Sequence, residues 1–158
     1  MSFEFLGLSD KLLRAIADEG YETPTPIQEE AIPAILAKHD VLASAQTGTG
    51  KTASFTLPIL HLLSATTQTR DRKIRALVLT PTRELAAQVE DSIKTYGKYM
   101  PLRVASVYGG VRMGPQIARL RRGVDVLVAT PGRLLDHLGQ GTIDLSAVDM
   151  LVLDEADR

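Results

Sequence analysis

The sequence of 158 residues contains no cysteine, which excludes a disulfide framework and a cysteine-based metal site. Its three histidines, His39, His61 and His137, do not have the spacing of a metal-ligand cluster. No apolar run approaches the roughly 18 residues of a membrane span, and the opening MSFEFLGLSD lacks the basic region and cleavage site of a signal peptide. We therefore expect a cytoplasmic protein that has no membrane partner.

The sequence also lacks an excess of one charge. Its 18 basic and 19 acidic residues give a net charge of -1, which argues against a polycationic surface. If the protein binds nucleic acid, the contacts must be local. Basic residues cluster at 70–75 and at 119–122, and each cluster can be either a solvated face or a nucleic-acid contact.

The apolar runs of strand length do not alternate with polar residues, as the strands of a one-sided sheet would. Continuous apolar runs are instead typical of parallel strands that are buried on both faces. Four such runs are DVLASA at 40–45, RALVLT at 75–80, DVLVAT at 125–130 and DMLVLD at 149–154, and RVASVYGG at 103–110 is a shorter, more polar fifth.

Helical patterns separate these runs, at 51–64, 83–98, 114–121 and about 131–138. Two apolar helical faces come first, one of Leu12, Leu13, Ile16 and Ala17, the other of Ile27, Ala31, Ile32 and Ile35. This alternation predicts a single α/β domain with a parallel sheet. Ligands of such sheets bind at the carboxyl ends of the strands.

The segment AQTGTGKT follows the first run and matches a phosphate-binding loop except that alanine stands first. In such a loop Lys51 reaches the phosphate oxygens and the Thr52 hydroxyl binds Mg²⁺. The alternative, a glycine-rich turn without a ligand, leaves Lys51 unexplained. The loop residues expected to surround the phosphates are Ala45, Gln46, Thr47, Gly48, Thr49 and Gly50.

Acidic residues follow the last apolar run. Asp154 stands where a nucleotide hydrolase holds Mg²⁺ through its water shell, and Glu155 is the candidate base for the attacking water. An acidic transition from strand to loop is the alternative, and the phosphate loop upstream argues against it. We therefore predict that Lys51, Asp154 and Glu155 are catalytic, with ATP and Mg²⁺ as cofactors.

The motifs GYETPTPIQ, AQTGTGKT, PTREL, TPGR and VLDEADR, in this order, resemble the DEAD-box RNA helicases, and among them the bacterial RhlE-type members. The resemblance covers nearly the whole chain. It implies an N-terminal helical segment at 1–39 with an adenine-recognition motif, and at 40–158 part of a RecA-like domain whose mainly parallel sheet is flanked by helices on both faces. It also implies that Asp157 couples this domain to a second RecA-like domain.

The segment PTPIQ has two interpretations. Thr25, Pro26 and Gln28 form a capping box with proline at the first helical position, which needs no ligand. The resemblance instead makes Gln28 the residue that reads the adenine edge, since an amide both donates and accepts. It also makes Phe3 the aromatic that stacks on adenine, and it places Tyr21 at the nucleotide.

The sequence T-P-x-R occurs twice directly after a predicted strand. Each copy presents a helix N-terminus and an arginine, which together can bind phosphates without reading bases. Proline is also common at a first helical turn for structural reasons. The resemblance assigns both copies to the RNA backbone, with a glycine pair between them; the residues are Pro81, Thr82, Arg83, Gly109, Gly110, Thr130, Pro131, Gly132 and Arg133.

Two other functions remain open at this stage: a phosphate-loop ATPase of another class, and an ATP-dependent RNA clamp in which hydrolysis only resets binding. The resemblance further implies a strand ending in Ser-Ala-Thr, and this sequence lacks such a strand and a second RecA-like domain. We therefore expect the chain alone to be poorly stable, to hydrolyse ATP negligibly and to unwind nothing.

Overall fold

The computed structural model describes residues 2–41, 50–65 and 72–154. Contacts within the chain are concentrated in two compact units. The first unit comprises residues 1–66 and 92–101, and the second comprises residues 67–91 and 102–158. The predicted division into 1–39 and 40–158 does not coincide with these units and stays a prediction.

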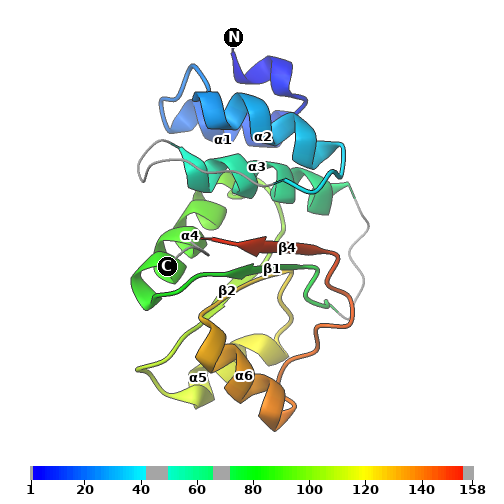
Figure 1. The fold of residues 1–158 in the computed structure, drawn as a ribbon. Coiled ribbons are helices and arrows are strands. Elements are labelled where there is room, and N and C mark those ends of the chain that lie inside the picture. Colours follow the sequence, from blue (N-terminus) through cyan, green and yellow to red (C-terminus); the bar gives the residue numbers. More distant parts are fainter. Residues whose placement is uncertain (1, 42–49, 66–71, 155–158) are drawn as a thin grey trace. The chain divides into compact units, whose positions relative to one another are not determined.

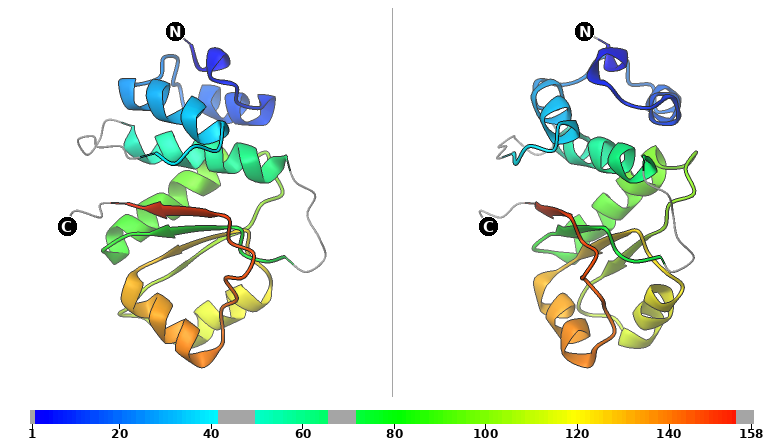
Figure 2. Two further views of the ribbon diagram at one scale, coloured as in Figure 1. Left: turned by 45° about the vertical axis from the view of Figure 1, so that its right-hand side comes forward. Right: turned by 90° about the vertical axis from the view of Figure 1, so that its right-hand side faces the viewer.

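The first unit is helical. It contains η1 (Phe3–Leu6), α1 (Asp10–Asp18), α2 (Pro26–Leu36), α3 (Lys51–Ser64) and the end of α4 (Arg83–Tyr96) (Figure 1). Figure 2 shows α2 packed along α3, and both predicted apolar faces are buried, through Leu12 and Ile16 on α1 and Ile32 on α2. None of the described helices is long and apolar enough to cross a membrane.

The second unit contains a sheet of four described strands, β1 (Ala76–Leu79), β2 (Val104–Val107), β3 (Val126–Ala129) and β4 (Met150–Leu153). All pairs are parallel and the spatial order is β2-β3-β1-β4. The α/β class with a parallel sheet is therefore confirmed. The predicted strand at 40–45 lies almost wholly outside the described residues.

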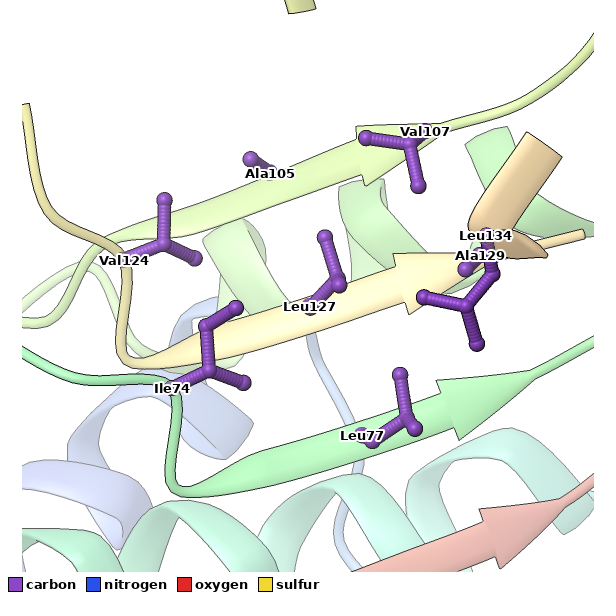
Figure 3. Close-up of a cluster of buried hydrophobic side chains, with 8 residues drawn as sticks. All are labelled: Ile74, Leu77, Ala105, Val107, Val124, Leu127, Ala129 and Leu134. Atoms are coloured by element: carbon purple, nitrogen blue, oxygen red, sulfur yellow. The ribbon is translucent and has the colours of Figure 1, made fainter. Parts of the chain in front are cut away.

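One face of the sheet carries the hydrophobic cluster drawn in Figure 3. The register pairs Leu77 with Leu127 and Leu127 with Ala105, so these three side chains lie on the same face, where Leu134 of α6 (Pro131–Gln140) joins them. Leu120 of α5 (Met113–Arg121) also packs on this cluster. Figure 1 places α5 and α6 together on that side of the sheet.

The opposite face is contacted by the first part of α4, because Ser106 of β2 donates a hydrogen bond of 2.8 Å to Glu90 of that helix. Helices of the second unit thus lie against both faces, as predicted. β4 is an outermost strand of the described sheet. Its Leu151 and Leu153 pair with Leu77 and Leu79 of β1 and lie on the same face as the cluster, yet they are 59% and 58% exposed.

The basic cluster at 70–75 has a structural role that the sequence did not reveal. Arg72 and Arg75 place guanidinium nitrogens 2.6 and 3.3 Å from the two carboxylate oxygens of the buried Asp125, which also accepts a hydrogen bond of 2.9 Å from Arg103 N. In the second basic cluster, Arg119 Nη2 lies 2.6 Å from Glu90 Oε1. Arg72 and Arg75 are therefore largely covered structural residues, whereas the Arg119 side chain is ion-paired but 40% exposed.

Replacing Asp125 with alanine should strongly destabilise the second unit. The variant leaves two largely covered guanidinium groups and one backbone N–H without their common acceptor, and the expected loss is about 3 kcal/mol in the free energy of unfolding. Asp144→Ala is the control, since its contact with Lys73 is 4.0 Å long and exposed. Chemical denaturation should show a large loss for Asp125→Ala alone, and equal losses would contradict this assignment.

Candidate functional site

The N-terminus of α3 lies where the sequence predicts phosphate binding. Gly50 stands at its N-cap in the left-handed conformation, with φ 84° and ψ 16°, and no described side chain caps the helix. The N–H groups of the first turn point out of such a helix end and favour a phosphate. Lys51 and Thr52 follow directly, as the sequence predicts. The rest of the predicted loop, Ala45, Gln46, Thr47, Gly48 and Thr49, lies outside the described residues.

The predicted capping box at the start of α2 is confirmed. Thr25 Oγ1 accepts from Gln28 N at 3.4 Å, and Thr25 N donates to Gln28 Oε1 at 3.0 Å. The same amide also donates from Nε2 to Gly50 O at 3.1 Å. Gln28 therefore ties α2 to the residue that starts α3.

Two observations favour glycine at position 50. Its φ is positive, and a Cβ built there would lie 2.4 Å from Gln28 Nε2. Each polar atom of the Gln28 side chain still has capacity for a ligand, because a carbonyl oxygen has a second lone pair and the amide nitrogen a second hydrogen. The capping role and the predicted adenine contact are thus compatible.

The two aromatic residues predicted at the nucleotide differ in exposure. Tyr21 is 56% exposed, whereas Phe3 is buried in η1 at 7% exposed. A ring covered to that extent offers little face for stacking on a base unless η1 moves. The adenine contact predicted for Phe3 therefore stays a prediction, and it is weaker on these grounds than the one for Gln28.

The sheet of the second unit brings four predicted segments to one edge. The register aligns the last residues of all four strands, since Leu79 pairs with Ala129 and Leu153, and Ala129 pairs with Val107. Parallel strands end at the same edge, so the segments that follow them are neighbours. These segments are Thr80 to Arg83 after β1, Tyr108 to Gly110 after β2, Thr130 to Arg133 after β3 and Asp154 after β4.

The first T-P-x-R segment points outward. Pro81, Thr82 and Arg83 are exposed, and Thr82 Oγ1 accepts a hydrogen bond of 3.2 Å from Leu85 N at the start of α4. Arg83 reaches the glycine pair, because a Cβ built on Gly110 would lie 3.3 Å from Arg83 Nη1. An exposed guanidinium therefore lies over an exposed turn.

The second T-P-x-R segment differs. Pro131 and Gly132 are exposed at the start of α6, whose N-cap Thr130 makes no side-chain capping bond to the described residues. Arg133, however, has a side chain that is only 12% exposed and donates from Nη1 to Val111 O at 2.9 Å. The sequence predicted the same role for both arginines, and the structure turns one outward and the other inward.

Two of the glycines at this edge are not needed by the fold itself. Gly109 and Gly132 have no positive φ, and a Cβ on either would meet no described atom within 4 Å. Gly110, by contrast, has a φ of 83°. Glycine without a conformational or steric reason leaves the backbone open to close approach by a ligand.

Thr52 and Asp154 carry side-chain oxygens of the kind that bind magnesium in nucleotide sites. Asp154 is buried at the end of β4, where its N–H donates to Leu79 O at 2.9 Å, while Glu155 and Asp157 lie outside the described residues. The described residues hold no group of three or more histidine or carboxylate side chains suited to a metal. Magnesium in nucleotide sites uses only one or two carboxylates beside phosphate and water oxygens, so Thr52 and Asp154 are suitable donors.

Sequence reasoning missed Gln116 and His137, two buried polar residues beside Arg133. Gln116 Oε1 lies 3.0 Å from His137 Nε2 and 3.4 Å from Arg133 Nη1. Burial lowers the pKa of His137 below its usual value, and the charge of Arg133 lowers it further. This group could not be predicted, because Gln116 of α5 and His137 of α6 lie 21 positions apart in the sequence and meet only after folding.

Comparison with known proteins identifies the family. The model of the DEAD/DEAH box helicase family matches residues 25–158. The chain is 52% identical to the ATP-dependent RNA helicase DeaD of Mycobacterium tuberculosis, over 99% of this chain and 27% of that protein. It is 48% identical to the ATP-dependent RNA helicase CshA of Limosilactobacillus reuteri, over 100% of this chain and 31% of that protein.

A solved structure agrees. The crystal structure of a hypothetical ATP-dependent RNA helicase from Sulfolobus tokodaii superposes with a TM-score of 0.85 at 43% identity, over 95% of this chain and 42% of that one. The chain thus spans less than a third of these two curated relatives, and the narrower resemblance to RhlE-type members stays a prediction. Because the family model covers residues 25–158, the chain belongs to the DEAD/DEAH box helicase family.

Proposed function

We propose that this chain is an N-terminal part of an ATP-dependent RNA helicase. It binds Mg²⁺-ATP and the RNA sugar-phosphate backbone, and within a complete protein it couples hydrolysis to local unwinding of RNA duplexes. The observation that carries this proposal is the shared edge of the parallel sheet, where two helix starts and an exposed glycine pair follow β1, β3 and β2. Its membership of the helicase family supports the same function.

The nucleotide contacts follow from the residues at the start of α3. Lys51 neutralises the phosphates of ATP, and the Thr52 hydroxyl and Asp154 carboxylate hold Mg²⁺, which when bound offsets the charge that develops on the phosphates. Glu155 accepts the proton of the attacking water. Gln28 forms hydrogen bonds with the adenine edge. Its hydrogen bond to Gly50 O links this base contact to the start of α3, next to the phosphates.

Replacing Gln28 should reduce the preference of the chain for ATP over GTP. Gln28→Glu is the informative variant, because a carboxylate still completes the capping box but cannot donate to adenine N7 or to Gly50 O. We expect ATP to lose about 5- to 100-fold of its advantage over GTP, as a bidentate amide contact is worth roughly 1–3 kcal/mol. Nucleotide competition on Gln28→Glu and Gln28→Ala measures it, and a variant that excludes GTP as well as the parent chain would refute the adenine contact.

The RNA contacts are proposed to be with the backbone. The exposed Arg83 supplies a charge, the starts of α4 and α6 supply N–H groups, and Gly109 and Gly132 allow close approach of a sugar-phosphate chain. None of these groups reads a base edge. This also explains how a chain of net charge -1 can bind RNA, because backbone amides do part of the work.

Binding should therefore depend on the sugar and hardly on base sequence. We expect a protein in which a second RecA-like domain follows this chain to bind three single-stranded RNAs of different composition alike, and DNA of the same sequence less well. Arg83→Ala should weaken RNA binding uniformly and lower the salt dependence by about one counterion. Arg121→Ala is the control, since this exposed residue ends α5 at the opposite edge of the sheet. Fluorescence anisotropy provides the measurement, and a strong preference for one RNA sequence would contradict backbone reading.

The remaining parts of the proposal concern the complete protein. A second RecA-like domain in the same protein is proposed to close on the nucleotide, with Asp157 coupling the two domains. Hydrolysis that drives unwinding and hydrolysis that only resets an RNA clamp are both consistent with these residues. A cytoplasmic location follows from the proposed substrates, ATP and RNA. A phosphate-loop ATPase of another class is the main competitor, and its turnover would not respond to RNA.

A further inference from the structure

A buried side-chain linkage joins the two segments that follow β2 and β3. We propose that Gln116 and His137 are positioning residues for RNA binding, which hold the turn at Gly109 and Gly110 in register with the start of α6. This inference rests on the proposed RNA contacts and adds residues that would not touch RNA themselves. Both side chains are buried, so neither can serve as a direct contact.

The turn after β2 is held at both of its ends. Before the glycine pair, Tyr108 O accepts a hydrogen bond of 3.0 Å from Gln116 Nε2. After the pair, Val111 O accepts one of 2.9 Å from Arg133 Nη1. The same Arg133 Nη1 lies 3.4 Å from Gln116 Oε1. One glutamine of α5 and one arginine of α6 thus close a ring around the exposed turn.

These partners define the orientation of the Gln116 amide. Tyr108 O can only accept, so the NH₂ group must face it, and the guanidinium of Arg133 can only donate, so the oxygen must face that. The same oxygen lies 3.0 Å from His137 Nε2, which must therefore carry the hydrogen. Gln116 Oε1 therefore accepts hydrogen bonds from both Arg133 Nη1 and His137 Nε2, and His137 lies in the second half of α6.

The other ring nitrogen completes the linkage. His137 Nδ1 lies 2.7 Å from Thr142 Oγ1. The Thr142 hydroxyl also donates to His137 O at 3.1 Å, so Thr142 contacts both the ring and the backbone of His137. The linkage therefore runs from Thr142, two residues after the end of α6, through His137 and Gln116, to the turn after β2.

The linkage matters because backbone recognition depends on spacing. Successive phosphates of a strand have a set separation, so N–H groups at the start of α6 and an open turn at Gly109 must be held at a matching distance. Neither glycine is anchored by a side chain of its own. We expect loss of the linkage to weaken RNA binding about 10-fold. The RNA contacts at the start of α6 and at the turn would shift relative to each other, although no RNA-binding group is deleted.

The test compares four variants of a protein in which a second RecA-like domain follows this chain, with a fluorescein-labelled single-stranded RNA as one probe and a fluorescent ATP analogue as the other. Gln116→Leu and His137→Leu break the linkage. His137→Gln keeps an N–H near the position of Nε2 and should restore binding. Ser106→Ala is the matched control, because it removes a different buried hydrogen bond of the same unit, the one to Glu90.

The expected result is RNA affinity about 10-fold weaker in both leucine variants, near-parent affinity in His137→Gln and Ser106→Ala, and unchanged affinity for the ATP analogue throughout. Circular dichroism checks folding, and Gln116→Glu, which cannot donate to Tyr108 O, replaces Gln116→Leu if that variant is unfolded. If the leucine variants bind RNA as well as Ser106→Ala does, the inference is wrong while the proposed function stands. If the parent two-domain protein binds no RNA, or Arg83→Ala has no effect, the proposed RNA surface itself fails and the inference with it.

Discussion

The 158-residue chain alone should hydrolyse ATP roughly 10³ to 10⁵ times more slowly than a protein in which a second RecA-like domain follows it. In related nucleotide hydrolases an arginine supplied by another domain or protein stabilises the charge of the transition state, and this factor is its usual contribution. The chain spans 27% of its DeaD relative, so most of such a protein lies beyond the residues compared. The expectation is a chain that binds ATP and barely turns it over.

A steady-state assay of released phosphate, with and without RNA, measures this difference. Binding of a fluorescent ATP analogue by the same preparation is the control, because it separates a folded, inactive chain from an unfolded one. Comparable turnover by the short chain and the longer protein would show that the residues for hydrolysis are complete within 1–158. The role proposed for a second domain would then be wrong.

The second large effect should come from Glu155 and should be confined to the chemical step. Glu155→Gln keeps the size of the side chain and removes its basicity, so hydrolysis in the two-domain protein should fall by about 10² to 10⁴. Binding of Mg²⁺-ATP should be preserved. Lys51→Ala removes a charged hydrogen-bond donor from the phosphates and should instead weaken ATP binding by about 10- to 100-fold, from roughly 1.5–3 kcal/mol.

Measuring both constants on both variants tests this division of roles. Titration with the ATP analogue gives affinity, and single-turnover hydrolysis gives the rate of the chemical step. An equal loss of affinity in Glu155→Gln and Lys51→Ala would mean that Glu155 organises the site instead of acting as its base. Arg121→Ala, at the exposed end of α5, should leave both constants as they are.

The elements could be predicted because their apolar patterns are unambiguous. The runs at 75–80 and 125–130 contain β1 and β3, each one residue shorter at either end, and the pattern at 51–64 coincides with α3. The order β2-β3-β1-β4 could not be predicted from these patterns, since strand pairing depends on contacts far apart in the sequence. The short η1 was missed because four residues are too few to show a periodicity.

The site was predictable where a residue's role depends on its neighbours in the sequence. Gln28 is an example, because three positions from Thr25 define the capping box. Roles that depend on distant partners were not predictable. Arg83 and Arg133 occupy the same place in identical motifs, yet only Arg133 meets Val111 O and Gln116, and those contacts exist only after folding. Arg72 and Arg75 belong to a basic run whose acidic partner, Asp125, lies about fifty positions away.

The central claim, that this chain supplies ATP- and RNA-binding residues of a helicase, is tested most directly by the effect of RNA on ATP hydrolysis. The measurement is the rate of phosphate release by the chain joined to a second RecA-like domain, in the presence and absence of single-stranded RNA. The account predicts hydrolysis that rises strongly with RNA, does not respond to DNA of the same sequence, and is greatly reduced by Arg83→Ala at limiting RNA. Hydrolysis at one rate regardless of RNA would contradict it and would place the chain among phosphate-loop ATPases of another kind.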